Sequence, residues 1–194
     1  GAQHSQSFES WIAQTPGLKV ISVSNPYDAK GLLKSAIRDD DPVVFMESEL
    51  MYSDMGELPD EDEELLIPIG KAKVVREGSD VTLISFNKMV HVATEAAEKL
   101  EGEDISAEVI DLRTIRPMDY NTIIESVKKT NRVVVVEESW PFANLSTEIA
   151  YSIQKEAFDH LDAPVSRVTG ADTSFHYAPT LVDAFLPNAD RVVQ

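Results

Sequence analysis

The sequence of 194 residues contains no cysteine. This absence excludes disulfide bonds, metal sites built on thiolates and cysteine nucleophiles. Basic residues are also scarce: 17 lysines and arginines stand against 34 aspartates and glutamates, so the formal net charge is −17. Such a charge disfavours nucleic acid or an anionic membrane as a partner, and it suits a basic protein partner.

Long apolar runs and familiar catalytic motifs are missing as well. No run approaches the roughly 18 residues of a membrane span, and the first residues lack the basic start and apolar stretch of a secretory signal. GxGxxG, Walker, HExxH and GxSxG sequences do not occur, so the sequence predicts no self-contained phosphate loop. Because the opening residues read like the middle of a loop, we expect a fragment of a longer protein.

Apolar runs and helical periods alternate along the chain, which predicts strands and helices in turn. The expected strands span residues 18–22, 43–46, 69–75, 81–86, 107–111, 132–137 and 165–169. The expected helices lie around residues 8–15, 26–38, 90–100, 119–129 and 144–158. This order predicts an α/β fold with a mostly parallel sheet that helices cover on both faces.

Residues 53–65 crowd acidic side chains around Gly56 and Pro59 without a basic residue, a composition typical of a solvated linker. We therefore expect residues 1–52 to form the last part of one α/β domain and residues 66–194 to form a second domain. In the helix that follows Asn25 and Pro26, the apolar positions predicted to face the core are Ala29, Leu32, Leu33, Ala36 and Ile37.

The stretch Asp111–Asp119 joins a buried strand to a helix and carries Arg113 and Arg116. A strand end followed by a turn and a helix start is where open α/β sheets usually place their sites. The alternative is a structural βα turn, in which the two arginines hold neighbouring loops by hydrogen bonds. The spacing of the residues leaves both interpretations open.

His4 lies in a loop that opens a helix, where an imidazole could exchange protons with a molecule in a cleft. The alternative is an exposed or helix-capping histidine. No two of the four histidines share a metal-binding spacing.

Two acidic clusters stand at the ends of expected elements. Asp39 to Asp41 follow a helix end, where the last carbonyls of the helix and the nearby carboxylates could coordinate a hard cation. The alternatives are pairing with Arg38 or a merely solvated turn. Glu137 and Glu138 follow an apolar strand, and we favour a structural or interface role for them because no nucleophile or companion base is near in sequence.

Taken together, seven segments resemble the C-terminal portion of the beta-subunit family of pyruvate dehydrogenase, the thiamine-diphosphate-dependent first component of its complex. They occur in the family's order and span essentially the whole chain: Gly1–Gln6, Lys34–Asp39, Glu49–Tyr52, Leu66–Lys73, Leu112–Asp119, Leu161–Pro164 and Val168–Asp172. Branched-chain and acetoin enzymes share this frame, and the sequence Arg-Pro-Met-Asp at residues 116–119 is most similar to the pyruvate type.

The resemblance implies that residues 1–52 end a pyrimidine-binding domain and that residues 66–194 form a transketolase C-terminal domain. It also implies thiamine diphosphate and Mg²⁺ as cofactors, held mainly by an alpha subunit and by sequence upstream of this chain. No cofactor-binding residue is expected in this segment, and the segment alone is expected to be inactive. The compartment implied is the cytoplasm of a bacterium or the mitochondrial matrix of a eukaryote.

A few residues carry over from the family by position. His4 matches an active-site histidine that donates or accepts protons around the substrate and the lipoyl acceptor. A K⁺ site and a docking position follow by the same matching: Ala36, Ile37, Asp39 and Asp41 for K⁺, and Asp162 for docking on the acetyltransferase core. Relatives often have Asn at position 41, which puts the K⁺ affinity in question.

The implied partners are the alpha subunit, a second beta subunit, the dihydrolipoamide acetyltransferase core, pyruvate and lipoamide, with neither nucleic acid nor membrane. The implied contact role of Arg113 and Arg116 is between domains and subunits. Two alternatives remain open: a branched-chain or acetoin sibling enzyme, and a non-catalytic α/β module that docks through its acidic face.

Overall fold

The computed structural model describes residues 4–60 and 64–194, so residues 61–63 of the expected linker lie outside the described residues. The strands are β1 (Lys19–Ser22), β2 (Val43–Met46), β3 (Lys73–Arg76), β4 (Val81–Ser85), β5 (Ala107–Asp111), β6 (Thr114–Arg116), β7 (Val133–Val136) and β8 (Ser166–Val168). The helices are α1 (Glu9–Ala13), α2 (Pro26–Ile37), α3 (Met89–Glu101), α4 (Tyr120–Thr130), α5 (Leu145–Ala157), α6 (Pro179–Phe185) and α7 (Ala189–Val193), with 3-10 turns η1 at Glu49–Met51 and η2 at Phe158–His160.

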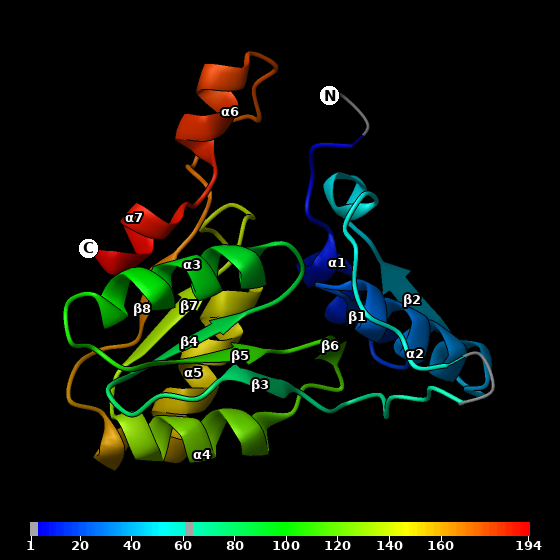
Figure 1. The fold of residues 1–194 in the computed structure, drawn as a ribbon, viewed down its shortest axis with the longest axis horizontal. Coiled ribbons are helices and arrows are strands. Elements are labelled where there is room, and N and C mark those ends of the chain that lie inside the picture. The colour runs from blue at the N-terminus through cyan, green and yellow to red at the C-terminus, as the bar shows by residue number, and fades with distance from the viewer. Residues whose placement is uncertain (1–3, 61–63) are drawn as a thin grey trace.

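The large sheet has the order β3-β5-β4-β7-β8, and only β3 runs antiparallel to its neighbour. Helices α3 and α7 cover one face, and α4 and α5 cover the other (Figure 1). Successive side chains of a strand point to opposite faces of the sheet, so one strand can contact the helices on both faces. Leu83 packs in the cluster under α3, while its neighbour Ile84 packs in the cluster under α4 and α5. The predicted α/β fold with a mostly parallel sheet between helices is confirmed.

The small sheet has the order β2-β1-β6, and its third strand comes from the stretch at residues 111–119. The expectation of a plain turn there is wrong: β6 pairs antiparallel with β1, with Ile21 opposite Thr114. The physical reason is that Val20 and Ile21 are fully buried, so the backbone groups of β1 need a partner on this side. The stretch therefore joins the two sheets (Figure 1).

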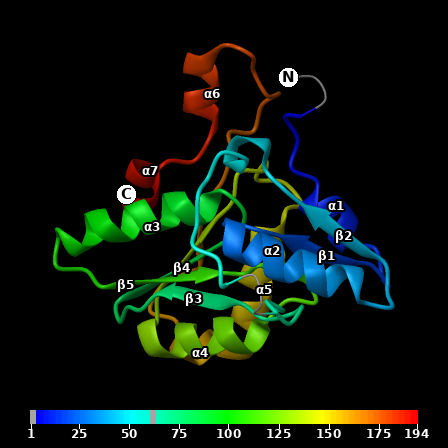
Figure 2. The same cartoon turned by 45° about the vertical axis from the view of Figure 1, so that its right-hand side comes forward.

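Helix α2 packs through a narrower face than its apolar pattern predicted. Leu32 is fully buried, but Leu33 and Ile37 are 43% and 76% exposed, so the prediction that these two face the core is wrong. The chain after the acidic segment covers one side of α2, where a side chain at Gly31 would meet Ile67 at 2.7 Å. Figure 2 shows α2 alongside the small sheet.

Side-chain caps fix where three of the predicted helices begin. Asn25, Asp119 and Asn144 each accept a hydrogen bond from a backbone N–H in the first turn of α2, α4 and α5. Such caps satisfy donors that have no partner inside the helix. These helix starts agree with the sequence prediction.

The final helices α6 and α7 were not predicted. Ala189 and Val192 of α7 are buried against α3, and α6 begins at Pro179, a residue that suits the first helical position. Helix α6 and the segment that starts at His4 rise on the same side of the molecule in both views (Figures 1 and 2). In the described part of the chain, no helix has the length and apolarity to cross a membrane.

Candidate active-site cleft

A cleft of about 720 Å³ lies where the small sheet, the large sheet and the α6 region meet. Residues directly after β2, β4 and β7 line its floor, which places it at the carboxyl ends of parallel strands. That edge is the usual position of sites in α/β proteins. The walls come from residues 4–9, the η1 region and the aromatic side chains Trp140, Phe175 and Phe185.

His4 lines this cleft and is exposed. It stands in the segment of residues 4–8, which we call the His4 segment and which leads into α1. An imidazole in this place can exchange protons with a molecule that enters the cleft. The proton-transfer role of His4 itself stays a prediction.

The carboxylate of Glu138 joins the His4 segment to the large sheet. Ser7 Oγ donates to Glu138 Oε1 at 3.0 Å, and Lys88 Nζ lies 2.5 Å from Glu138 Oε2. Glu138 follows β7 and Lys88 follows β4, so the carboxyl ends of neighbouring strands bring the two side chains together. These contacts are of the kind that the structural or interface role favoured for Glu138 requires, and that role stays a prediction.

Glu9 anchors the start of α1 beside the same cleft. Its side chain is buried and accepts a hydrogen bond from Ser22 Oγ at 3.1 Å, while Asn87 Nδ2 donates to Ser22 Oγ at 2.9 Å. Burial, reinforced by the negative charge of Glu138, raises the pKa of the Glu9 carboxyl. Glu9 therefore retains a proton more readily than an exposed glutamate does.

Glu137 is a buried structural carboxyl beneath the cleft. It is 1% exposed, and its Oε1 accepts from the backbone N–H of Ser146 at 3.1 Å. Burial raises the pKa of Glu137 to about 7, with a further contribution from the charge of Glu9 and opposition from the hydrogen bonds of Ser146. The structural or interface role predicted for Glu137 stays a prediction, and its burial favours the structural alternative.

The arginines of residues 111–119 contact the small-sheet side of the molecule and not the cleft. Arg113 Nε and Nη2 donate to the two oxygens of the fully buried Asp28 at 2.9 and 2.5 Å. Arg116 Nη1 donates to the carbonyl of Ala13 at 2.5 Å. These bonds favour the structural interpretation of the stretch over a catalytic one.

Asp111, which ends β5, is held at the same junction. Its oxygens accept from the hydroxyl of Ser24 and from the backbone N–H of Arg113, the latter at 2.9 Å. Burial raises the pKa of Asp111 to about 6, although both hydrogen bonds oppose that shift. The end of β5 and the residues directly after it are thus hydrogen-bonded to Ser24 and to Asp28 in the small-sheet region.

Two of the four predicted K⁺ ligands, Asp39 and Asp41, pair with a lysine in the structure, and the carbonyl of Ala36 accepts from the backbone N–H of Asp39 at 3.3 Å. Lys19 Nζ lies 2.7 Å from Asp39 Oδ1 and 3.0 Å from Asp41 Oδ2. The hydrogen bond from Lys19 lowers the pKa of Asp39. Arg38 pairs instead with Glu64, at 2.5 Å. Among the described residues, no group of three or more His, Cys, Asp or Glu side chains is arranged to hold a metal ion.

Asp162 lies outside the cleft, after η2 and on the surface. Its Oδ2 is 2.8 Å from Arg132 Nη2, with both side chains more than half exposed. The cleft and Asp162 are therefore separate features of the chain.

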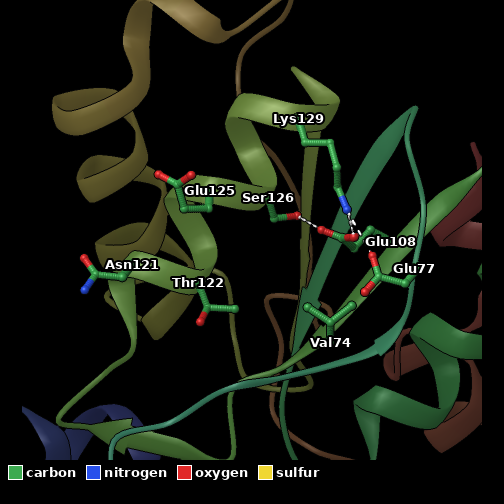
Figure 3. A pocket seen from close by; sticks show the side chains of 8 residues that line it. All are labelled: Val74, Glu77, Glu108, Asn121, Thr122, Glu125, Ser126 and Lys129. Atoms are coloured by element: carbon green, nitrogen blue, oxygen red, sulfur yellow. Dashed lines mark hydrogen bonds and ion pairs between the residues drawn. The ribbon is translucent and has the colours of Figure 1, made fainter.

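A second hollow, of about 450 Å³, lies between α4 and the edge of the large sheet (Figure 3). Glu108 of β5 points into it and is held by Ser126 Oγ and Lys129 Nζ. Burial acts to raise the pKa of Glu108, but the hydrogen bonds from Lys129 and Ser126 outweigh it and leave that pKa lowered. A carboxylate so fully paired serves to hold α4 on the sheet.

Sequence reasoning missed the partners that build the cleft: Ser7, Glu9, Asn87 and Lys88. A usable signal existed for Lys88, because it follows a buried strand in the same way that Glu138 does. No comparable signal marks Ser7 or Glu9, since their partners lie far away in the sequence.

The chain belongs to the transketolase family: the description "Transketolase, C-terminal domain" matches residues 70–192, and "Transketolase, pyrimidine binding domain" matches residues 1–54. Among solved structures, a split gene transketolase described as an inactive beta4 tetramer superposes with a TM-score of 0.75 at 25% identity. That match covers 95% of this chain and 57% of the other.

Curated relatives are pyruvate dehydrogenase E1 component beta subunits. The mitochondrial subunit of Dictyostelium discoideum is 52% identical over 195 residues, covering 100% of this chain and 55% of that protein. The subunit of Rhizobium meliloti is 50% identical over 192 residues, covering 99% of this chain and 42% of that protein. The resemblance to this beta-subunit family is confirmed, and the chain spans about half the length of the relatives it matches.

Proposed function

We propose that this chain is the C-terminal part of the beta subunit of a pyruvate dehydrogenase. In this proposal the whole enzyme decarboxylates pyruvate with thiamine diphosphate and transfers the acetyl group to lipoamide. The main support for the proposal is that about half of the residues, along essentially the whole chain, are identical to those of E1 beta subunits. A cleft lined by His4 supports it further. We divide the chain as before, with residues 1–52 and 66–194 in two domains and residues 53–65 between them.

Thiamine diphosphate, when bound, supplies the carbanion chemistry of decarboxylation. No residue of this chain is assigned to the diphosphate or to Mg²⁺, which we assign to an alpha subunit and to upstream sequence; the chain alone is then inactive. The chain's own contribution is His4, which holds or moves a proton at one nitrogen of its ring beside the substrate. The aromatic side chains Trp140, Phe175 and Phe185 line the same cleft and offer an apolar wall to a substrate there.

For K⁺, the backbone carbonyls of Ala36 and Ile37 and the carboxylates of Asp39 and Asp41 are oxygen ligands of a suitable kind. The ammonium group of Lys19 competes for the same carboxylates. We therefore propose a weak K⁺ site. A larger rise in melting temperature with KCl than with choline chloride would support it, and equal rises would contradict it.

Asp162 is proposed to contact a basic side chain of the acetyltransferase core, because its carboxylate is exposed and the chain is strongly acidic. Asp162→Asn should weaken capture of the full-length dehydrogenase by that core. Capture equal to that of wild type would remove the role. A second beta subunit is a further proposed partner.

The test of the function is co-expression of the full-length beta subunit with its alpha subunit. We expect a stable assembly that releases CO₂ from pyruvate faster than from branched-chain oxoacids, and that turns over pyruvate faster than it cleaves acetoin to acetaldehyde and an acetyl group. A preference for either of the latter would assign the sibling enzyme. Failure to assemble or to turn over any of the three would favour a non-catalytic docking module.

A further inference from the structure

The His4 segment crosses from the small-sheet region to the large sheet without forming a helix or strand of its own. Its Ser7 hydroxyl donates to a carboxylate 131 residues further along the chain, that of Glu138, at 3.0 Å. A segment without internal backbone pairing depends on such contacts for its position. Ser7 is three residues from His4, so this contact lies close to the imidazole.

Lys88 holds Glu138 in place. The ammonium group lies 2.5 Å from Glu138 Oε2, and the two side chains are only 18% and 19% exposed. Among the described residues Glu138 Oε2 has no hydrogen-bond partner, so the contact with Lys88 is an ion pair, and its attraction is screened less in these partly buried surroundings than at the surface. Since Lys88 and Glu138 both follow strands of the large sheet, the carboxylate that receives Ser7 is fixed by the rigid part of the fold.

Two other carboxyl groups lie near that of Glu138. Glu9 is buried and lines the same cleft, and Glu137 is buried next to Glu138 in the chain. A partly buried ion pair such as that of Lys88 and Glu138 is by itself weak evidence of a stabilising role. The position of Glu138, between Lys88 and the His4 segment, is what distinguishes it from the other two.

We propose that Glu138 is a positioning residue, which holds the His4 segment against the large sheet so that the imidazole faces the cleft. Glu138 acts through Ser7 and does not contact the reacting atoms. The importance of that position for turnover rests on the proposed function, whereas the attachment of the segment does not.

The experiment measures amide hydrogen exchange of residues 4–8 in the full-length beta subunit assembled with its alpha subunit. Glu138→Ala and Ser7→Ala should each raise that exchange about tenfold, the effect of losing one hydrogen bond to a charged group. Glu138→Gln, which still offers an oxygen to Ser7, should restore part of the protection. Glu125→Ala, on the exposed face of α4, is the matched control and should leave it unchanged.

Turnover of pyruvate in the same variants separates the positioning role of Glu138 from the proposed role of His4 in turnover. We expect kcat to fall about ten- to a hundredfold in Glu138→Ala, with a smaller change in KM, because His4 is displaced while the cleft remains. Unchanged exchange in both Glu138→Ala and Ser7→Ala overturns the positioning role, whatever the activity. Raised exchange with wild-type turnover confirms the attachment and contradicts the role of His4.

Discussion

Two polar junctions tie the small-sheet region to the large sheet, and they differ in burial. At the first, Arg113 forms an ion pair with Asp28, and the two side chains are 11% and 0% exposed. At the second, Glu138 links Ser7 to Lys88 beside an open cleft. We call them the buried junction and the cleft junction.

Both junctions are built from charged hydrogen-bonding side chains, but the difference in burial gives them different roles. The buried junction is closed to solvent and lined by groups that stay paired, so its value is to fix how the two regions sit together. The cleft junction faces a cavity large enough for a substrate-sized molecule. Changes at the first should therefore appear in stability, and changes at the second in the placement of His4.

The largest expected effect on stability is that of Arg113→Ala. Removal of the guanidinium leaves the Asp28 carboxylate buried without its bidentate partner, which costs about 3–5 kcal/mol of unfolding free energy. Urea unfolding of the full-length protein measures this loss. The double variant Arg113→Met with Asp28→Leu should recover part of it, and a loss below about 1 kcal/mol in Arg113→Ala would contradict a buried junction.

A smaller effect is expected from pH, through Glu137. Its pKa is raised from 4.5 to about 7 in the folded protein, so between these values the folded state keeps a proton that the unfolded state releases. Stability should consequently fall as pH rises from about 4.5 to 7, by about 3 kcal/mol from this group, and then level off.

Glu137→Gln removes that titration while it keeps an oxygen for the N–H of Ser146. Unfolding measured at pH 5 and at pH 7.5 should give a variant whose stability relative to wild type increases with pH. Asp111 contributes a similar trend to both proteins, so the comparison cancels it. Parallel pH profiles for the two proteins would contradict the assignment.

The smallest effect is expected from Arg116→Ala. Arg116 donates one hydrogen bond to the carbonyl of Ala13, and its loss should cost about 1–2 kcal/mol. The same unfolding assay ranks it below Arg113→Ala. Equal losses in the two variants would show that the burial of Asp28 is not what distinguishes the buried junction.

Much of the fold could be predicted from the sequence, because the spacing of apolar residues within a short segment indicates which of its side chains are buried. The apolar runs at Val81–Ser85 and Val133–Val136 indicated buried strands, and Asn144 indicated a helix start. Helix α6 was missed although Pro179 marked its first position, since its short apolar run resembles a loop. Strand β6 was missed because only its pairing with β1 makes three residues into a strand.

The candidate site could be predicted only in part. His4 was found through its resemblance to a family position, and its place in a cleft agrees with that expectation. Glu138 was noted as one of two carboxylates after a strand, but its partner Ser7 could not be inferred from position 138. Contacts between residues far apart in sequence depend on how the sheets sit together, and local periodicity carries no information on that.

The central claim is that His4, held by the cleft junction, takes part in turnover without supporting the fold. The most direct test is the turnover number of His4→Ala in the full-length beta subunit assembled with its alpha subunit, at saturating pyruvate. We predict a fall of about a hundredfold or more, with the unfolding free energy changed by less than about 0.5 kcal/mol, as for other exposed positions. Turnover equal to that of wild type would contradict the claim.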